Sequence, residues 1–276
     1  MLPATGGPVP APPRARSRRQ RARRATVLIL LCQVALLALL IALWEWATSS
    51  SKVNAFLFGS PGIIGTALIQ MARDGSLWRD ASITGGETIA GFLLGNLIGT
   101  AVGLSLWFSR FAARIVQPFI LALGAVPIVA LAPLTIIWFG TGFASKLAMA
   151  TLSVVVVALV ISYKGALGVD PDQINLMRAM GAGRRQIFRH LVLPASLTDI
   201  FAGLKLTVGF ALVGAILGEF MSSTDGLGHA IFKAGSLYVI SKVFADLAVT
   251  VALALILAAV VSQIERRLLP WRHDLQ

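Results

Sequence analysis

Six long apolar runs constrain this chain more than any other feature of its sequence. Each run has roughly 17 to 26 residues, enough to cross a hydrocarbon core of about 30 Å with some tilt. Of the 276 residues, 57% are hydrophobic and only 13% are charged, and a soluble protein of this length cannot bury so much apolar surface. We therefore predict an all-α membrane protein with six transmembrane helices. The predicted spans are residues 27–46, 83–108, 115–139, 147–163, 197–220 and 243–261.

The basic residues are distributed unevenly between the loops, and this pattern predicts the orientation of the chain. If the N-terminus is cytoplasmic, 18 of the 24 lysines and arginines lie on the cytoplasmic side, as the positive-inside rule requires. Both termini are then cytoplasmic. The formal net charge of +12 does not indicate nucleic-acid binding, because the basic residues cluster in segments that alternate with the apolar runs. The lipid bilayer is the partner that this pattern predicts.

The N-terminal segment differs in composition from the rest. Residues 1–25 are rich in Pro, Ala and Arg and contain no acidic residue, which is typical of disorder. We predict a disordered, basic cytoplasmic tail over residues 1–25 and a transmembrane domain over residues 26–276. A signal peptide is the alternative for the first apolar run, but the run is too long for one and five more spans follow it.

A charged segment at residues 170–194 interrupts the apolar pattern between the fourth and fifth spans. Asp170 is a typical N-cap residue, Pro171 suits the first position of a helix, and Gly181 offers the left-handed stop common at helix C-termini. A second short helix follows Gly183. We predict a cytoplasmic elbow of two short helices joined by a glycine hinge. The apolar stripe predicted for its first helix is Ile174, Met177 and Met180.

The residues of the elbow leave its role open. A solvated helix at the lipid surface and a docking element for a soluble partner both fit the pattern. In the second span, four glycines at strict i, i+4 spacing occupy one helix face and predict close packing against another helix. Such packing suits a channel, a transporter or a membrane enzyme equally. The four are Gly91, Gly95, Gly99 and Gly103.

The third predicted span contains three prolines, so it should be kinked or locally unwound. In membranes such breaks occur where neighbouring helices or a cavity satisfy the freed carbonyl groups. A pathway-lining helix and a bent structural helix both remain open at this point. Pro127 and Pro133 are candidate pathway or gate residues, with Pro118 the third proline.

Catalytic chemistry is not visible in the sequence. Glu87, Glu219 and Asp246 lie near the outer ends of spans and form no mid-membrane relay, although Glu219 is a candidate for gating or docking on the outer side. We predict no catalytic residue and no metal site. Residues 140–146 read GTGFASK, which lacks the second glycine of a phosphate-binding loop, so this chain is not expected to hydrolyse ATP alone.

The elbow resembles a motif of ABC importer permeases, which reads Glu-Ala-Ala, three residues, Gly, nine residues, then Ile-x-Leu-Pro. Gly181 matches the glycine, residues 182–190 are the nine that follow, and residues 191–194 read LVLP, ending at Pro194. The front end departs from the motif. The residues that replace Glu-Ala-Ala are Asn175, Leu176 and Met177.

Further runs resemble the nitrate/sulfonate/taurine-type branch of these permeases, and the resemblance covers about residues 60–270. The runs are GFLLG at 91–95, VPIVALAPL at 126–134, WFG at 138–140, GEF at 218–220 and GLG at 226–228.

The resemblance implies the permease subunit of a binding-protein-dependent importer in a bacterial plasma (inner) membrane. Two permease copies, as a homodimer, would form the pathway. A separate ATPase subunit would carry ATP and Mg²⁺, and an extracytoplasmic binding protein would deliver a small anionic or zwitterionic solute such as nitrate, a sulfonate or taurine. By resemblance, the ATPase-coupling residues are Asn175, Leu176, Met177, Arg178, Ala179, Met180, Gly181 and Pro194.

Two other classes of protein remain as alternatives. A stand-alone channel or ion-coupled secondary carrier would not need a glycine-hinged cytoplasmic elbow, and should show charge pairs in mid-membrane. The second alternative is a structural or assembly subunit that has no transport role. The residues in the spans do not identify a solute.

Overall fold

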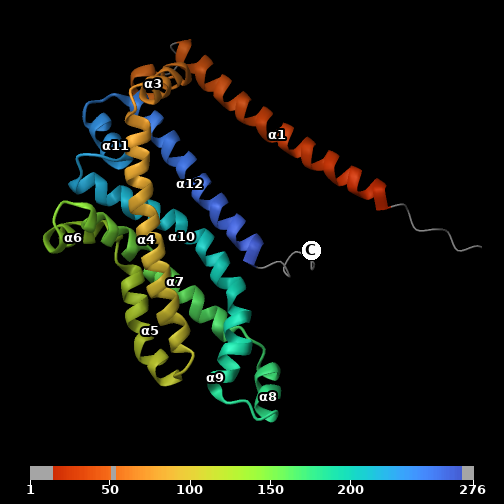
Figure 1. Cartoon of the computed structure of the whole chain (residues 1–276). Coiled ribbons are helices and arrows are strands. Elements are labelled where there is room, and N and C mark those ends of the chain that lie inside the picture. Colours follow the sequence, from red (N-terminus) through yellow and green to blue (C-terminus); the bar gives the residue numbers. More distant parts are fainter. Residues whose placement is uncertain (1–14, 51–53, 269–276) are drawn as a thin grey trace, which may run out of the picture. The chain divides into compact units, whose positions relative to one another are not determined.

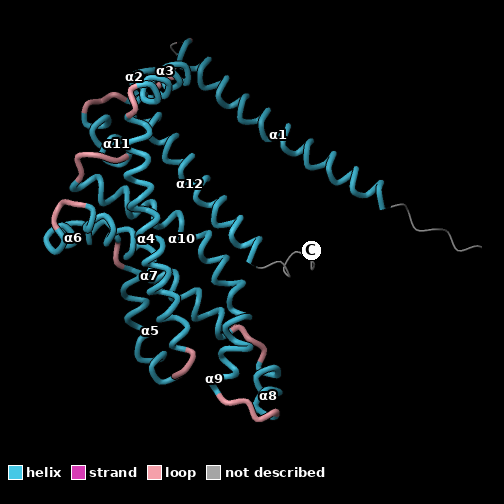
Figure 2. The backbone as a smooth tube through the Cα atoms, in the orientation of Figure 1, coloured by secondary structure: helices cyan, strands magenta, loops and turns pink. Residues whose placement is uncertain are grey.

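The computed structural model describes residues 15–50 and 54–268, and this part of the chain is helical, with no strand. Figure 2 shows that the loops are short connections between helices. The chain divides into two compact units, Met1–Gly62 and Ile63–Gln276.

The first unit contains α1 (Ala15–Ser49), α2 (Ala55–Phe58) and the start of α3 (Pro61–Arg73). Helix α1 begins at Ala15, so residues 15–25 of the predicted disordered tail are helical. Alanine and arginine are both strong helix formers, and the apolar helix that follows gives them a nucleus from which to extend. Residues 1–14 lie outside the described part. At the other end of the unit, the Glu45 carboxylate accepts hydrogen bonds from Ser60 Oγ at 3.1 Å and Gly62 N at 2.9 Å.

The second unit contains the remaining helices, coloured yellow to blue in Figure 1. Most are regular α-helices; η1 is a short 3₁₀ turn and η2 a π-helical turn. They are α4 (Ser76–Leu106), α5 (Arg110–Ala125), η1 (Ile128–Leu131), α6 (Ala132–Phe139), α7 (Phe143–Leu167), α8 (Pro171–Ala179), α9 (Arg184–Ile187), η2 (Phe188–Val192), α10 (Leu193–Ser222), α11 (Leu227–Ser236) and α12 (Ile240–Leu268).

Helices α4 and α7 pack along the predicted glycine stripe. A Cβ atom on Gly95 would lie 2.6 Å from Val154 Cβ, and one on Gly99 would lie 2.8 Å from Ala158 Cβ. Both distances are too short for a contact between two carbon atoms that are not bonded, so only glycine permits this approach. Gly91 and Gly103 occupy the same face, against residues 150–151 and 159–163. The packing face predicted from the sequence is therefore present along most of α4.

The pairing of these residues also fixes the relative direction of α4 and α7. Partners on α7 advance from Ala150 to Ala158 as positions on α4 advance from Gly91 to Gly99, so the two helices are parallel. Two parallel membrane helices joined by one segment require that segment to cross back. The bent pair α5 and η1–α6 supplies this return crossing, which brings five long apolar helices to six spans in the described part of the chain.

The return crossing bends by 92°, more than the kink expected from its prolines. Val126 and Pro127 both adopt extended backbone conformations, with ψ values of 122° and 120°. The ring of a proline disfavours a helical conformation in the residue before it, which explains the break at this step. Pro118 lies within α5 and Pro133 in the first turn of α6, so only one of the three prolines separates helical segments.

Pro194 does not begin a separate helix, because α9, η2 and α10 form one continuous helical run, Arg184–Ser222. The proline lacks an N–H group and its ring would clash with the carbonyl of the residue four positions earlier. The helix widens into the π turn just before it, where Leu193 N–H donates to Phe188 O. This local widening accommodates the proline without ending the helix.

Helix α10 runs antiparallel to α7 and completes the core. Gly203 packs against Ile161, while Gly218 packs against Lys146 at the other end. Helix α12 lies against α10 through an ion pair between Lys205 and Glu265. Lys205 lies in the half of α10 nearer the elbow, and Glu265 lies near the end of α12. The C-terminal end of α12 is therefore beside the half of α10 that follows the elbow.

At the opposite end of α10, Glu219 holds the short helix α11 against the bundle. Its carboxylate is fully buried and accepts hydrogen bonds from Thr84 Oγ1 at 2.7 Å and from Gly228 N at 2.6 Å. Thr84 Oγ1 in turn accepts from Leu227 N at 2.8 Å. A Cβ atom on Gly228 would lie 2.7 Å from Glu219 Oε2, so glycine is required there. Thr84 and Glu219 thus accept from the first two amide groups of α11, which a helix cannot pair internally.

We expect Gly99→Leu to destabilise the protein by about 1–3 kcal/mol, the usual range for overpacking a tight interface. The added side chain would force α4 away from α7. Gly86→Leu is the matched control, because a Cβ on Gly86 of the same helix meets nothing within 4 Å. Thermal unfolding of both variants in detergent measures the difference. Equal melting temperatures for the two variants would show that the glycine face does not determine stability.

We expect Thr84→Val to loosen α11, because it removes one donor to Glu219 and one acceptor for Leu227 N. Leaving buried polar groups unpaired costs about 1–3 kcal/mol. Hydrogen exchange at residues 227–228 should become faster in the variant. Thr84→Ser keeps the hydroxyl and should exchange like the wild type; if serine and valine behave alike, the hydrogen bonds are not what holds α11.

Candidate functional site

The elbow, residues 170–194, connects α7 to α10 and lies at the end of the bundle away from α11 (Figure 1). Its first helix, α8, begins as the sequence predicts. Asp170 Oδ1 accepts a hydrogen bond from Asp172 N at 2.9 Å, and Pro171 is the first helical residue. Both features satisfy or remove amide groups that a helix start leaves unpaired.

Gly181 ends α8 in a left-handed conformation, with φ of +82°. Ala182 N donates to Met177 O and Gly181 N donates to Arg178 O, both at 2.9 Å, which is the Schellman pattern of a helix C-terminus. A Cβ atom on Gly181 would meet nothing within 4 Å. The glycine is therefore required for its backbone conformation rather than for space, and the predicted hinge is present.

The two faces of α8 have different environments. Ile174 and Met177 pack against a buried cluster, whereas Leu176 and Met180 are 62% and 78% exposed. Met180 is therefore not part of the predicted apolar stripe. Residues three apart on a helix are separated by about 300° of rotation, so a stripe with this spacing drifts by about 60° at each step and Met180 turns away. The cluster consists of Ala166, Val169, Ile187 and Val192.

The other predicted coupling residues divide into two groups. Asn175, Arg178 and Ala179 are exposed on α8, and Arg178 Nη1 donates to Asn175 Oδ1 at 3.4 Å. Pro194 is exposed too, but it lies in α10 beyond the π turn. The structure thus brings residues 175–181 together on α8 and at its end, and places Pro194 on a separate helix.

Trp107, at the end of α4, is an elbow contact that we did not predict. Its ring lies 5.6 Å from that of Phe188, and the Arg184 guanidinium lies 5.5 Å above its centre. Arg184 Nη2 also donates to Trp107 O at 3.3 Å. The only hint in the sequence is an aromatic pair, Trp107 and Phe108, where the second span ends.

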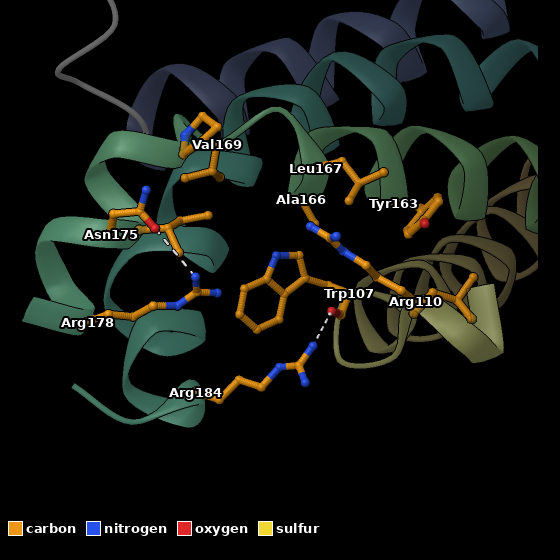
Figure 3. Close-up of a pocket in the computed structure, with 12 residues that line it drawn as sticks. Trp107, Arg110, Tyr163, Ala166, Leu167, Val169, Asn175, Arg178 and Arg184 are labelled. Atoms are coloured by element: carbon orange, nitrogen blue, oxygen red, sulfur yellow. Dashed lines mark hydrogen bonds between the residues drawn. The ribbon is translucent and has the colours of Figure 1, made fainter. Parts of the chain in front are cut away.

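A cavity of about 320 Å³ lies between the elbow and the ends of α4 and α7. Figure 3 shows the side chains of Trp107, Arg110, Arg178 and Arg184 around it. Tyr163 of α7 also contributes to the lining. The elbow is therefore in contact with the bundle around a basic, partly aromatic cavity, rather than standing free of it.

The candidate pathway residues have contrasting environments. Pro127 and Pro133 are exposed in the single chain, on the bent return crossing. Glu219 is fully buried and bonded to Thr84 and Gly228, so its geometry in this structure is that of an anchor for α11.

Comparison with known proteins places these features in a family. Residues 95–270 match the family of binding-protein-dependent transport system inner membrane components. The matched segment includes α7, the elbow, α10, α11 and all of α12.

Named relatives cover most of this chain and most of their own length. A putative aliphatic sulfonates transport permease of Bacillus subtilis is 29% identical, covering 86% of each protein. A riboflavin transport system permease of Chloroflexus aurantiacus is 30% identical over 85% of this chain and 88% of its own. The taurine transport system permease of Escherichia coli is 26% identical over 88% and 90%.

Among solved structures, an inward-facing form of the MetNI methionine ABC transporter superposes with a TM-score of 0.64. The match is 21% identical in sequence and covers 71% of this chain and 97% of the other, and it supports the fold. With the family match and the six spans, this establishes a multi-pass membrane protein. The chain belongs to the binding-protein-dependent inner membrane components, the permease subunits of ABC importers, and resembles their sulfonate- and taurine-type branch.

Proposed function

We propose that α8 couples this permease to a separate ATPase subunit, and that its exposed apolar face is the docking surface. The observation that carries the proposal is the exposure of Leu176 and Met180 on a short helix whose other face is firmly packed. Exposed apolar side chains at the end of a membrane bundle, away from lipid, are typical of protein contact sites. ATP and Mg²⁺ belong to the ATPase in this proposal, and this chain binds neither.

The packing of the elbow would transmit a movement of α8 to the membrane helices. Met177 contacts the cluster that includes Ala166 at the end of α7 and Val192 at the end of η2, where α10 begins. Trp107 joins the same cluster from the end of α4. A displacement of α8 would therefore move three core helices together, as a rigid-body switch between inward- and outward-facing states requires.

The pathway itself requires a second permease copy, which we propose to be identical. Pro127 and Pro133 lie on the return crossing, where many apolar side chains of α5 and α6 are exposed in the single chain. A partner copy would cover part of this surface and enclose the route of the solute. The exposed aromatic and aliphatic residues include Phe119, Leu121, Leu123, Ile137 and Trp138.

The orientation follows from charge. The elbow contains Arg178, Arg184, Arg185 and Arg189, so it is the cytoplasmic side by the positive-inside rule. We place the C-terminus on that side, because the end of α12 lies beside the half of α10 that follows the elbow. We place the N-terminus there as well. A binding protein would then approach the opposite end, where α11 lies.

The solute class is proposed from the relatives. Their names include aliphatic sulfonates, taurine and riboflavin, all small organic solutes, and two of the three names denote sulfonates. A small anionic or zwitterionic solute is the class that they favour. The binding protein is the component that selects it.

We expect Leu176→Asp with Met180→Asp to abolish co-purification of ATP-hydrolysing activity with the tagged chain in mild detergent. Two carboxylates would be desolvated in an apolar contact, which is costly. The matched control is Leu237→Asp, a leucine that is 64% exposed at the α11 end. It should retain the ATPase. Retention by the double variant would contradict the assignment of this face.

We expect Gly181→Val to reduce solute uptake while membrane insertion is unchanged, because a left-handed conformation costs a non-glycine residue about 1–2 kcal/mol. Gly181→Asn should transport closer to the wild-type rate, since asparagine tolerates that conformation. Uptake into cells or vesicles, normalised to the amount of folded protein, distinguishes the two. Normal uptake by the valine variant would show that the hinge geometry is not needed for coupling.

A further inference from the structure

We propose that the cavity beneath the elbow binds a phosphoryl group, carried by an anionic lipid or by a soluble phosphate. The site is formed by Arg110, Arg178 and Arg184 around Trp107 (Figure 3). These three arginines come from three different helices, α5, α8 and α9. A ligand held by all of them would join the elbow to the start of the return crossing.

The charge of the lining is the first argument. Arginines are the only charged residues among the twelve that line the cavity. A second cavity of about 390 Å³ shares Trp107 and all three arginines, so the basic surface extends along the elbow. Three cations that face one space repel each other, and an anion between them removes this repulsion.

The hydrogen bonds of the arginines are the second argument. Each guanidinium has five N–H donors, and the structure assigns Arg178 a bond to Asn175 Oδ1 and Arg184 a bond to Trp107 O. Within residues 15–50 and 54–268, none of the three arginines forms an ion pair with a carboxylate. Donors therefore remain for a ligand, and the fork of a guanidinium matches two oxygens of a phosphate.

The position of the cavity is the third argument. Leu106 and Leu167, the last residues of α4 and α7, both line it, so it lies where two membrane helices end. Trp107 and Tyr163 supply the aromatic side chains that are common at the level of lipid headgroups. A headgroup phosphate at the inner surface is thus at the right depth, and a soluble phosphate can enter from the cytoplasmic side.

Binding would affect the elbow in a definite way. Arg178 belongs to α8 and Arg110 belongs to α5. Within the described residues, no ion pair joins these two helices. A phosphate bound by both would restrain the movement of α8. This consequence rests on the coupling role proposed above, but the binding itself does not.

The experiment measures binding alone, with the purified full chain and no ATPase. Native mass spectrometry counts adducts of dioctanoyl phosphatidylglycerol, which has a net negative charge. Dioctanoyl phosphatidylcholine, whose headgroup is zwitterionic with no net charge, is the control. Inorganic phosphate is tested separately, as a competitor of the lipid and by its effect on thermal unfolding. Preference for phosphatidylglycerol identifies a lipid source, and stabilisation by millimolar phosphate without lipid preference identifies a soluble one.

The test variant is Arg110→Gln with Arg184→Gln, and the matched control is Arg185→Gln with Arg189→Gln. The control removes the same amount of charge, and both of its residues belong to the elbow, but neither lines either cavity. We expect the apparent affinity for the bound probe to fall about tenfold or more in the test variant and less than twofold in the control.

Arg110→Gln alone is a variant that should fold normally, because the Arg110 side chain forms no hydrogen bond within the described residues. It should weaken binding while the melting temperature without ligand stays unchanged. Equal losses in the test and control pairs would overturn the site. So would a wild type that neither prefers phosphatidylglycerol to phosphatidylcholine nor is stabilised by inorganic phosphate. Neither result would bear on the coupling proposal, since no ATPase is present.

Discussion

The close parallel contact between α4 and α7 determines the rest of this structure. Gly95 and Gly99 allow the two backbones to approach within a distance that any side chain would prevent. Because the helices are parallel, the segment between them must return across the membrane. The bent crossing follows from this interface, and α10 then returns antiparallel to α7 after the elbow. In lipid, where apolar side chains gain little by associating, such close packing is a main source of helix affinity.

Much of this arrangement could be predicted from the sequence. The lengths of the apolar runs determined the number of spans, and the glycine spacing predicted the face of α4 that packs. Asp170, Pro171 and Gly181 predicted the beginning and end of α8, because helix capping depends on a few adjacent residues. These predictions are local, so one sequence sufficed for them. The family followed from the order of several short runs.

The rest depends on contacts between distant segments. The 92° bend could not be distinguished from a kink, because three prolines offered three possible breaks and only the backbone at Val126 and Pro127 separates helices. Met177 packs against the buried cluster and Met180 is exposed because of which side of α8 meets the end of α7. Trp107 joins the elbow through tertiary packing alone, and the anchoring of α11 by Glu219 requires Thr84, 135 residues away in the chain.

The π turn before Pro194 has a consequence for comparing related permeases. A π turn accommodates about one more residue than an α turn, so the helical phase on its two sides differs by about 100° from that of a continuous α-helix. A helical wheel drawn through residues 184–222 would therefore assign elbow residues to the wrong face of α10. An aligned relative that lacks the extra residue would keep its membrane face but present a different side of its elbow. Insertions at this position thus change the direction in which the elbow faces while leaving the span itself intact.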